Sequence, residues 1–291
     1  MSQTITTAFV QQFNRNVYLL AQQKGSKLRG KVRVKQVNGK KAFFERLAPT
    51  EPQRKISRHQ DTPLVEQVHS RRAVGLEDWV AADLVDTEDE IRLLISPASL
   101  YANNFARGMG RQMDRAIVAA FTGDSESGQF GGSFVSFPAG QTLASGGATL
   151  TEPRVRQVKR MMDAAEVPEE GRVFVVSAQA MEGLLGETKV TSSDYNTVKA
   201  LVQGTIDGNM WMGFEWVRLA DDILPIDGSL DRSCFAYQSD AIGFALGRDI
   251  NTSMDRRPDK MNSLQVMTTA TFSAVRIEEV PVVQVLVREI A

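Results

Sequence analysis

The sequence predicts an α+β fold with one long helix, long strands near the end of the chain, and a smaller mixed unit between them. Three patterns carry this prediction: amphipathic spacing over residues 97–122, long strand signals in about the last forty residues, and strand, helix and strand signals within residues 168–250. The 291 residues are 42% hydrophobic and 24% charged, so the chain can bury a core without disulfide bonds.

The long helix is predicted over residues 97–122. Ser96 can cap the first N–H groups and Pro97 suits the first helical position, while apolar and basic residues fall largely on different faces. Gly108 and Gly110 each cost roughly 1 kcal/mol relative to alanine, which indicates a close neighbouring backbone or a bend. An ordinary core helix would show the same periodicity. The residues taken to mark this spine helix are Phe105, Arg107, Met109, Arg111, Met113 and Arg115.

Residues 3–23 also have helical spacing. A short terminal helix is marginal alone, so it must dock either on its own core or on another subunit.

Positive charge is concentrated near the N-terminus. Residues 24–58 hold twelve Lys or Arg against two acids, a charge of about +10, although the 34 basic and 35 acidic residues of the whole chain nearly cancel. Residues 32–47 alternate, and Asn38-Gly39 favours a tight turn, so we expect a long basic β-hairpin there. The residues proposed to reach another copy are Arg33, Lys35, Lys40, Lys41, Phe43 and Arg46. The prolines that follow, up to Pro63, predict an irregular extended stretch.

Residues 76–90 form a segment of negative charge. They contain seven acids and no base, so the two segments can pair within one chain or between copies. Exposed ion pairs contribute about 0 to 1 kcal/mol each, so their main effect would be on register and partner choice. The proposed acidic receiver consists of Asp83, Asp86, Glu88, Asp89 and Glu90.

The middle of the chain alternates between helices and strands. After a Gly- and Ser-rich loop with a short strand at 134–137, a helix capped by Thr151 is expected, then a buried strand at 172–177 and a short helix. A further helix is expected within 190–204.

Long strands follow. A hairpin is expected at 232–246, and two long strands near the end of the chain need the 97–122 helix to cover them.

This order of elements resembles the tailed-phage major capsid proteins of the Hong Kong 97 type. The strings that carry the resemblance are VYLLAQQKGSKLRGKV, PASLYANNFARGMGRQMD, VFVVSAQAMEGLL, VTSSDYNTVKALVQG and RRPDKMNSLQVMTTATFSAVRIEEVPVVQVLV. The resemblance implies an N-terminal arm (1–29), an extended loop lying over a neighbouring subunit (30–75), a peripheral domain (76–167 and 251–291) with the spine helix, and an inserted axial domain (168–250).

The function implied by this resemblance is self-assembly into the icosahedral shell around a phage's double-stranded DNA. The chain's partners would be itself, in hexamers and pentamers, together with candidate scaffolding, portal or decoration proteins and non-specifically packaged DNA. Its location would be the virion, after assembly in the host cytoplasm. A non-viral compartment shell of the same fold is an alternative.

Other classes receive less support from the sequence. An oligomeric nucleic-acid-binding protein could use the cations of residues 24–58, but Phe43 and Phe44 are adjacent in a strand pattern and offer little stacking surface. No catalytic motif or cofactor site is expected, since no such motif occurs in the sequence. A metal site needs three or four clustered ligands, but the chain has two histidines, His59 and His69, and one distant cysteine. That cysteine, Cys234, fits a small buried hydrophobic residue. No membrane partner is expected either, since no run of 18 apolar residues occurs.

Overall fold

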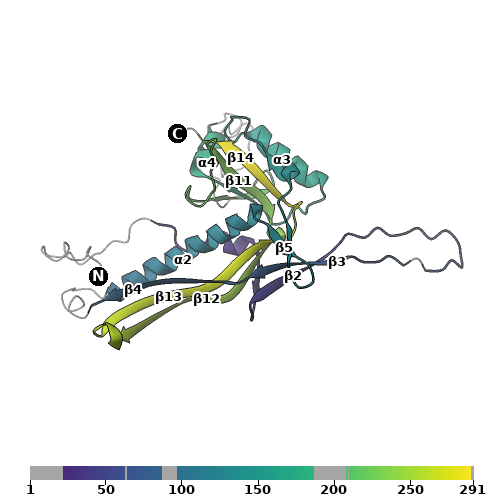
Figure 1. Ribbon diagram of the computed structural model, residues 1–291. Helices are drawn as coiled ribbons and strands as arrows, with labels where there is room; N and C mark the ends of the chain where they lie inside the picture. The colour runs from purple at the N-terminus through teal and green to yellow at the C-terminus, as the bar shows by residue number, and fades with distance from the viewer. Residues whose placement is uncertain (1–21, 63, 87–96, 187–207, 209, 290–291) are drawn as a thin grey trace.

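A computed structural model describes residues 22–62, 64–86, 97–186, 208 and 210–289. Figure 1 shows three parts: a long base in which a helix lies along a sheet, a rounded domain above one end of that helix, and a loop that projects far beyond both. The helices are α2 (Pro97–Thr122), α3 (Glu152–Ala164) and α4 (Ala178–Leu185).

The base is a four-stranded sheet in the order β1-β12-β13-β4, with α2 on one face. Phe244, Ala270 and Phe272 of this sheet are buried in one core with Met113 and Ile117 of α2. The predicted spine helix and its packing on the long strand near residues 263–276 are therefore confirmed. The strands are β1 (Arg33–Gln36), β12 (Ile242–Arg257), β13 (Ser263–Arg276) and β4 (Glu77–Val85).

The rounded domain contains a six-stranded sheet in the order β7-β14-β11-β8-β10-β9, together with α3 and α4. All five residues of β8 are buried, as the continuous apolar run predicts. Ser177 caps α4 by accepting a hydrogen bond from the Ala180 N–H at 3.0 Å. Thr151 precedes α3 as expected, but its side chain makes no capping hydrogen bond, so that part of the prediction is wrong. The strands are β7 (Thr142–Leu143), β14 (Val282–Arg288), β11 (Asp231–Gln238), β8 (Arg172–Val176), β10 (Phe214–Arg218) and β9 (Met210–Trp211).

The domain boundaries predicted at residues 168 and 250 do not coincide with the division of the chain between the two sheets. β14 belongs to the six-stranded sheet rather than to the base, and α3 packs in the core of the rounded domain. β12 begins at Ile242 yet belongs to the base. The sequence pattern marks these segments as strand or helix, but long-range pairing decides which sheet they join.

The hairpin expected at 232–246 does not form. β11 pairs with β14 and β8, while β12 pairs with β13 and β1, because the short turn Ser239–Ala241 carries the chain from one sheet into the other. Each of the two strands thereby has a partner strand on both of its edges.

The prediction of a basic hairpin at 32–47 is also wrong. β1 pairs in parallel with β12, where Arg33 lies opposite Gly243, and β2 pairs antiparallel with β3, where Lys41 lies opposite Gly75. The turn at Gly39, with φ of +146°, therefore passes the chain from the base into a third sheet. That sheet has the order β2-β3-β5-β6 and comprises β2 (Lys41–Leu47), β3 (His69–Gly75), β5 (Ser125–Ser127) and β6 (Ser133–Val135).

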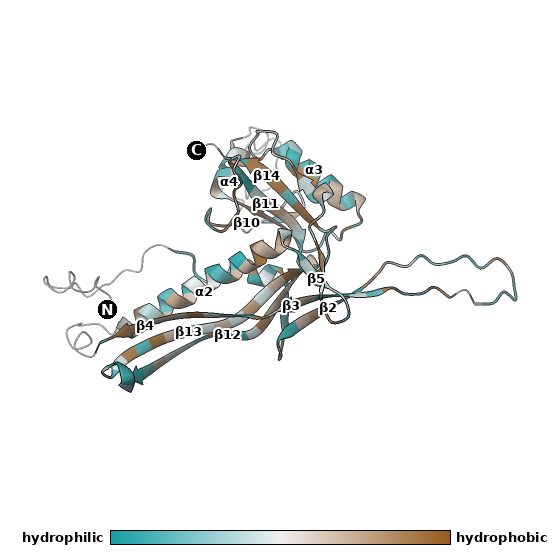
Figure 2. Cartoon of the chain, in the orientation of Figure 1, coloured by the Kyte–Doolittle hydropathy of each residue, from teal (hydrophilic) through white to brown (hydrophobic). Residues whose placement is uncertain are grey.

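Hydropathy separates these parts. In Figure 2 the strands of the rounded domain carry long hydrophobic stretches, whereas the projecting loop alternates between hydrophilic and hydrophobic residues without a second layer beside it. The loop therefore has no core of its own within this chain.

Candidate functional site

The extended loop, residues 48–68 between β2 and β3, is the part of the molecule least explained by the fold of a single chain. It has no regular strand or helix among its described residues, and its large apolar side chains Ile56 and Leu64 are each 86% exposed. Its internal contacts are sparse: the Ile56 N–H donates to Gln60 Oε1 at 2.8 Å, and Gln67 Nε2 donates to Thr50 Oγ1 at 3.0 Å. Uncovered apolar side chains on an extended segment make this loop a candidate contact surface.

The six residues predicted to reach another copy do not form one finger. Arg33 and Lys35 lie on β1 in the base, and Lys40 lies in the turn before β2. Lys41, Phe43 and Arg46 lie on β2, at the stem of the extended loop. The bases at the far end of the loop are instead Arg54, Lys55 and Arg58, all exposed.

Several of the clustered cations bind groups within the chain. Lys35 Nζ donates to the Phe43 carbonyl at 2.7 Å, and Lys41 Nζ donates to Glu126 Oε1 at 2.6 Å. The Lys41 ammonium, with help from the Gly132 N–H, lowers the pKa of Glu126. These two lysines therefore join β1, β2 and β5 within the chain.

Two other basic residues of segment 24–58, Arg29 and Lys31, bind acidic groups of the four-stranded sheet and of the rounded domain. The Arg29 guanidinium binds Asp249 with two hydrogen bonds of 2.8 and 2.7 Å, and it lowers the pKa of that carboxyl. Lys31 Nζ pairs with Glu215 on β10. These contacts reduce the charge available for a nucleic-acid surface.

The described members of the predicted acidic receiver lie along β4 and just after it. Asp83 is exposed on β4, and Asp86 accepts a hydrogen bond from Ser263 Oγ at 2.7 Å. Glu88, Asp89 and Glu90 lie outside the described residues. In Figure 1 this end of β4 and the extended loop lie at opposite ends of the molecule, so the two cannot meet within one chain.

The spine helix residues divide between core and polar contacts. Met109 and Met113 are buried, while Phe105 is half-buried and stacks on Tyr101 with ring centroids 6.3 Å apart. Arg107 is half-buried. Arg111 donates to Gln22 at 2.6 Å, and Arg115 pairs with Asp222.

One helix residue that the amphipathic pattern places on the polar face is fully buried. The Asp114 carboxylate accepts from Ser26 Oγ at 2.5 Å and from the backbone N–H groups of Lys27 and Leu28 at 3.1 Å each. Gly110, one turn before it, lets this segment approach, because a Cβ there would lie 2.5 Å from the backbone carbon of Gly25. The predicted close backbone at Gly110 is confirmed, and Asp114 explains what holds it.

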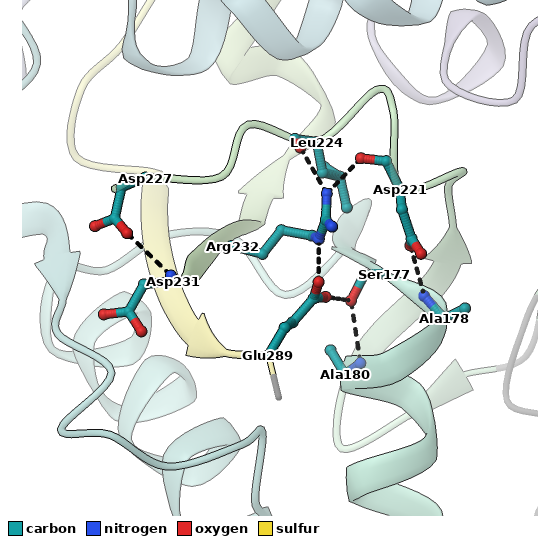
Figure 3. A network of polar contacts seen from close by, with 9 residues as sticks. All are labelled: Ser177, Ala178, Ala180, Asp221, Leu224, Asp227, Asp231, Arg232 and Glu289. Carbon is teal, nitrogen blue, oxygen red and sulfur yellow. Dashed lines mark hydrogen bonds and ion pairs between the residues drawn. The ribbon is translucent and has the colours of Figure 1, made fainter. Parts of the chain in front are cut away.

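The end of the chain is fixed to the rounded domain by a polar network (Figure 3). Glu289 accepts hydrogen bonds from Ser177 Oγ and from Arg232 Nε, both at 2.5 Å, and Arg232 also donates to the Leu224 carbonyl at 3.0 Å. Since all polar atoms of the Glu289 carboxylate have partners, this buried pair holds β11, β14 and the start of α4 together.

The cysteine is a buried core residue, as predicted. Burial raises the pKa of the Cys234 thiol to about 12, so the thiolate needed for nucleophilic chemistry is not available near neutral pH. Among the described residues, no three His, Cys, Asp or Glu side chains cluster in a way that could hold a metal ion. None of the described helices is both long and apolar enough to cross a bilayer.

Comparison with known proteins places the whole chain in one family. Residues 5–289 match the family described as phage capsid protein. The comparison with curated protein sequences found no significant match.

Solved structures agree in fold over nearly the full length. The capsid structure of the cyanophage P-SCSP1u aligns with a TM-score of 0.73 at 12% identity, covering 97% of this chain and 94% of that one. The capsid of Ralstonia phage GP4 aligns with a TM-score of 0.73 at 11% identity, covering 97% and 96%. A chain of Mycobacterium phage Bobi aligns with a TM-score of 0.66 at 15% identity, covering 100% and 99%.

These alignments confirm the α+β fold of the Hong Kong 97 type that the order of elements predicts. Because the family match runs from residue 5 to residue 289, this chain belongs to the phage capsid protein family and is a structural component of a virion shell.

Proposed function

We propose that the chain is the major subunit of an icosahedral shell, built from hexamers and pentamers of this chain, that encloses double-stranded DNA. The observation that supports this proposal is the extended loop, whose apolar side chains Ile56 and Leu64 are left uncovered by the described residues of the chain. Assembly in the host cytoplasm, with scaffolding, portal or decoration proteins as further partners and with DNA packaged non-specifically, belongs to the same proposal.

The contact between copies is proposed to run head to tail. The loop and the acidic end of β4 lie at opposite ends of one molecule, so the loop of one copy meets the acidic end of the next when subunits are arranged around a ring. The exposed bases Arg54, Lys55 and Arg58 carry the charge opposite to that of Asp83. Charge of this kind selects partner and register more than it adds affinity.

Charge reversal tests this contact. In the triple variant Arg54→Glu, Lys55→Glu and Arg58→Glu, we expect closed shells of uniform size, seen by negative-stain microscopy, to be replaced by small species. The matched control reverses the acids of the same loop, Glu51→Lys, Asp61→Lys and Glu66→Lys, and should still assemble.

A charge swap separates the contact from a general effect of net charge. Adding Asp83→Lys and Asp86→Lys to the triple variant should restore shells. If the triple variant already forms shells with the salt dependence of the unmodified protein, the steering role of the loop is wrong.

A shell of the same fold around other contents is the second candidate. The capsid of a native GTA particle also has this fold, with a TM-score of 0.66 at 13% identity. Nuclease protection of the purified particles distinguishes the two by the length and source of the enclosed nucleic acid.

A further inference from the structure

Glu279 lies where the three sheets of the molecule meet. It follows β13 of the base and precedes β14 of the rounded domain. The turn that carries it is fixed to the crossover between β11 and β12, because the Ile277 N–H donates to the Ala241 carbonyl at 2.7 Å. The Val282 N–H donates to the Glu279 carbonyl at 3.2 Å and closes the turn. The Glu279 side chain therefore starts from a backbone fixed by both the base and the rounded domain.

From this position the Glu279 carboxylate reaches both strands of the loop stem. Its Oε1 accepts a hydrogen bond from Arg72 Nη2 on β3, and its Oε2 lies 3.6 Å from Arg46 Nη1 on β2. The Arg72 and Glu279 side chains are 8% and 15% exposed, so this pair is largely withdrawn from water. A charged group buried to this extent is costly to leave without its partner.

A second buried guanidinium group, that of Arg276, lies near Glu279 where the three sheets meet. Arg276 is fully buried and donates to the carbonyls of Phe121 and Gly123 at the end of α2, and to Val135 of β6 at 3.0 Å. Burial lowers the pKa of Arg276, while the charge of Glu279 acts in the opposite direction. Glu279 thus pairs with Arg72 and Arg46 and, together with Asp124, opposes the positive charge of the buried Arg276.

We propose that Glu279 is a positioning residue that sets the direction in which the extended loop leaves the molecule. The inference rests on the proposed function, since the direction of the loop matters to assembly only if the loop meets a neighbouring copy. The carboxylate ties β2 and β3 to the turn between β13 and β14. Its loss leaves the third sheet held to the base by the apolar packing of Ala42, Phe44 and Val74, so that this sheet, with the loop it carries, can tilt while the other two cores stay packed. The subunit then folds, but presents its loop over a range of angles.

Distances in the unassembled subunit test this directly. Cys234 is buried, so Gln53→Cys in the loop and Asn251→Cys in the base can be spin-labelled selectively. In Glu279→Gln we expect the distribution of label distances, measured by pulsed electron paramagnetic resonance, to broaden about twofold, since a charge-assisted clamp is replaced by a neutral amide. At fixed subunit concentration, shell formation should fall about tenfold, the factor that corresponds to ~1.4 kcal/mol.

Two further variants keep the test decisive. Glu278→Gln changes the exposed neighbouring carboxylate on the same turn and should leave both the distances and assembly unchanged. Arg46→Gln removes only the 3.6 Å contact with Glu279 and should broaden the label distances less than Glu279→Gln does. This variant provides the test if Glu279→Gln does not fold.

The results separate the inference from the proposed function. A distance distribution in Glu279→Gln or Arg46→Gln that matches the unmodified protein would overturn the positioning role. Failure of the unmodified chain to form shells at all would instead overturn the proposed function, while the distances would still report on Glu279.

Discussion

In the rounded domain, Phe174 and Trp216 are fully buried and stack with ring centroids 4.6 Å apart, whereas Ile56 and Leu64 in the extended loop are each 86% exposed. Both regions contain large apolar side chains, but only one of them has a second layer to bury them against. Burying such a side chain is worth about 1.5 to 3 kcal/mol, so the rounded domain gains stability within one chain and the loop gains it only in an assembly. Together with the proposed function, this comparison predicts that folding and shell formation use different parts of the sequence.

The strongest test removes the loop. Replacing residues 50–66 by a short Gly-Ser turn should leave the unfolding transition of the subunit unchanged, because these residues contribute nothing to either core. Shell formation should be lost entirely. Thermal unfolding followed by circular dichroism and sedimentation velocity measure the two effects, and shells of normal size from the shortened chain would refute the distinction.

A core substitution should show the reverse behaviour. Phe174→Ala should lower the free energy of unfolding by about 3 to 5 kcal/mol, since it removes a ring that packs on both Trp216 and Phe214. The matched loop variant Ile56→Ala should leave that free energy within about 0.5 kcal/mol of the original value but weaken assembly. Chemical denaturation of the unassembled subunits gives both numbers. Equal destabilisation by the two changes would mean that the loop is part of the folded core.

Asp114 tests a third region, the segment from Gln23 to Leu28 that is held on the spine helix. Asp114→Asn should destabilise the subunit by about 2 to 4 kcal/mol, because one carboxylate oxygen becomes a donor facing existing donors. Asp83→Asn, on the exposed β4, is the control and should change little. Hydrogen exchange should show lost protection at the Lys27 and Leu28 amides, which donate to Asp114. Retained protection would show that the segment is held by other contacts.

The smallest expected effect concerns the exposed pair between Lys41 and Glu126. Its hydrogen bond lowers the pKa of Glu126 in the folded state below the ordinary value of 4.5. The pair therefore stabilises the fold above pH 4.5, and this contribution is lost as the pH falls through the lowered pKa. Lys41→Gln should cost less than about 1 kcal/mol at neutral pH and nothing once Glu126 is protonated. Unfolding measured across acidic pH checks this, and a constant difference at every pH would contradict it.

The sequence by itself determined the elements whose signals are local. The helices at 97–122, 152–164 and 178–185 and the buried strand at 172–176 follow from the apolar pattern within one segment. The order of these elements also carried the resemblance to phage capsid proteins, which the family match confirms.

Only the tertiary structure decided which strands pair with one another and which groups the charged side chains bind. β1 and β2 satisfy every local rule for a hairpin, yet they separate, because β1 pairs in parallel with β12 and β2 pairs antiparallel with β3. In the sequence, Asp114 and Glu279 have no local feature that distinguishes them from surface acids. In the fold, Asp114 accepts a hydrogen bond from Leu28, 86 residues away, and Glu279 accepts one from Arg72, 207 residues away. Local patterns fix which backbone conformation a segment adopts, but the burial of a polar group depends on which distant segment covers it.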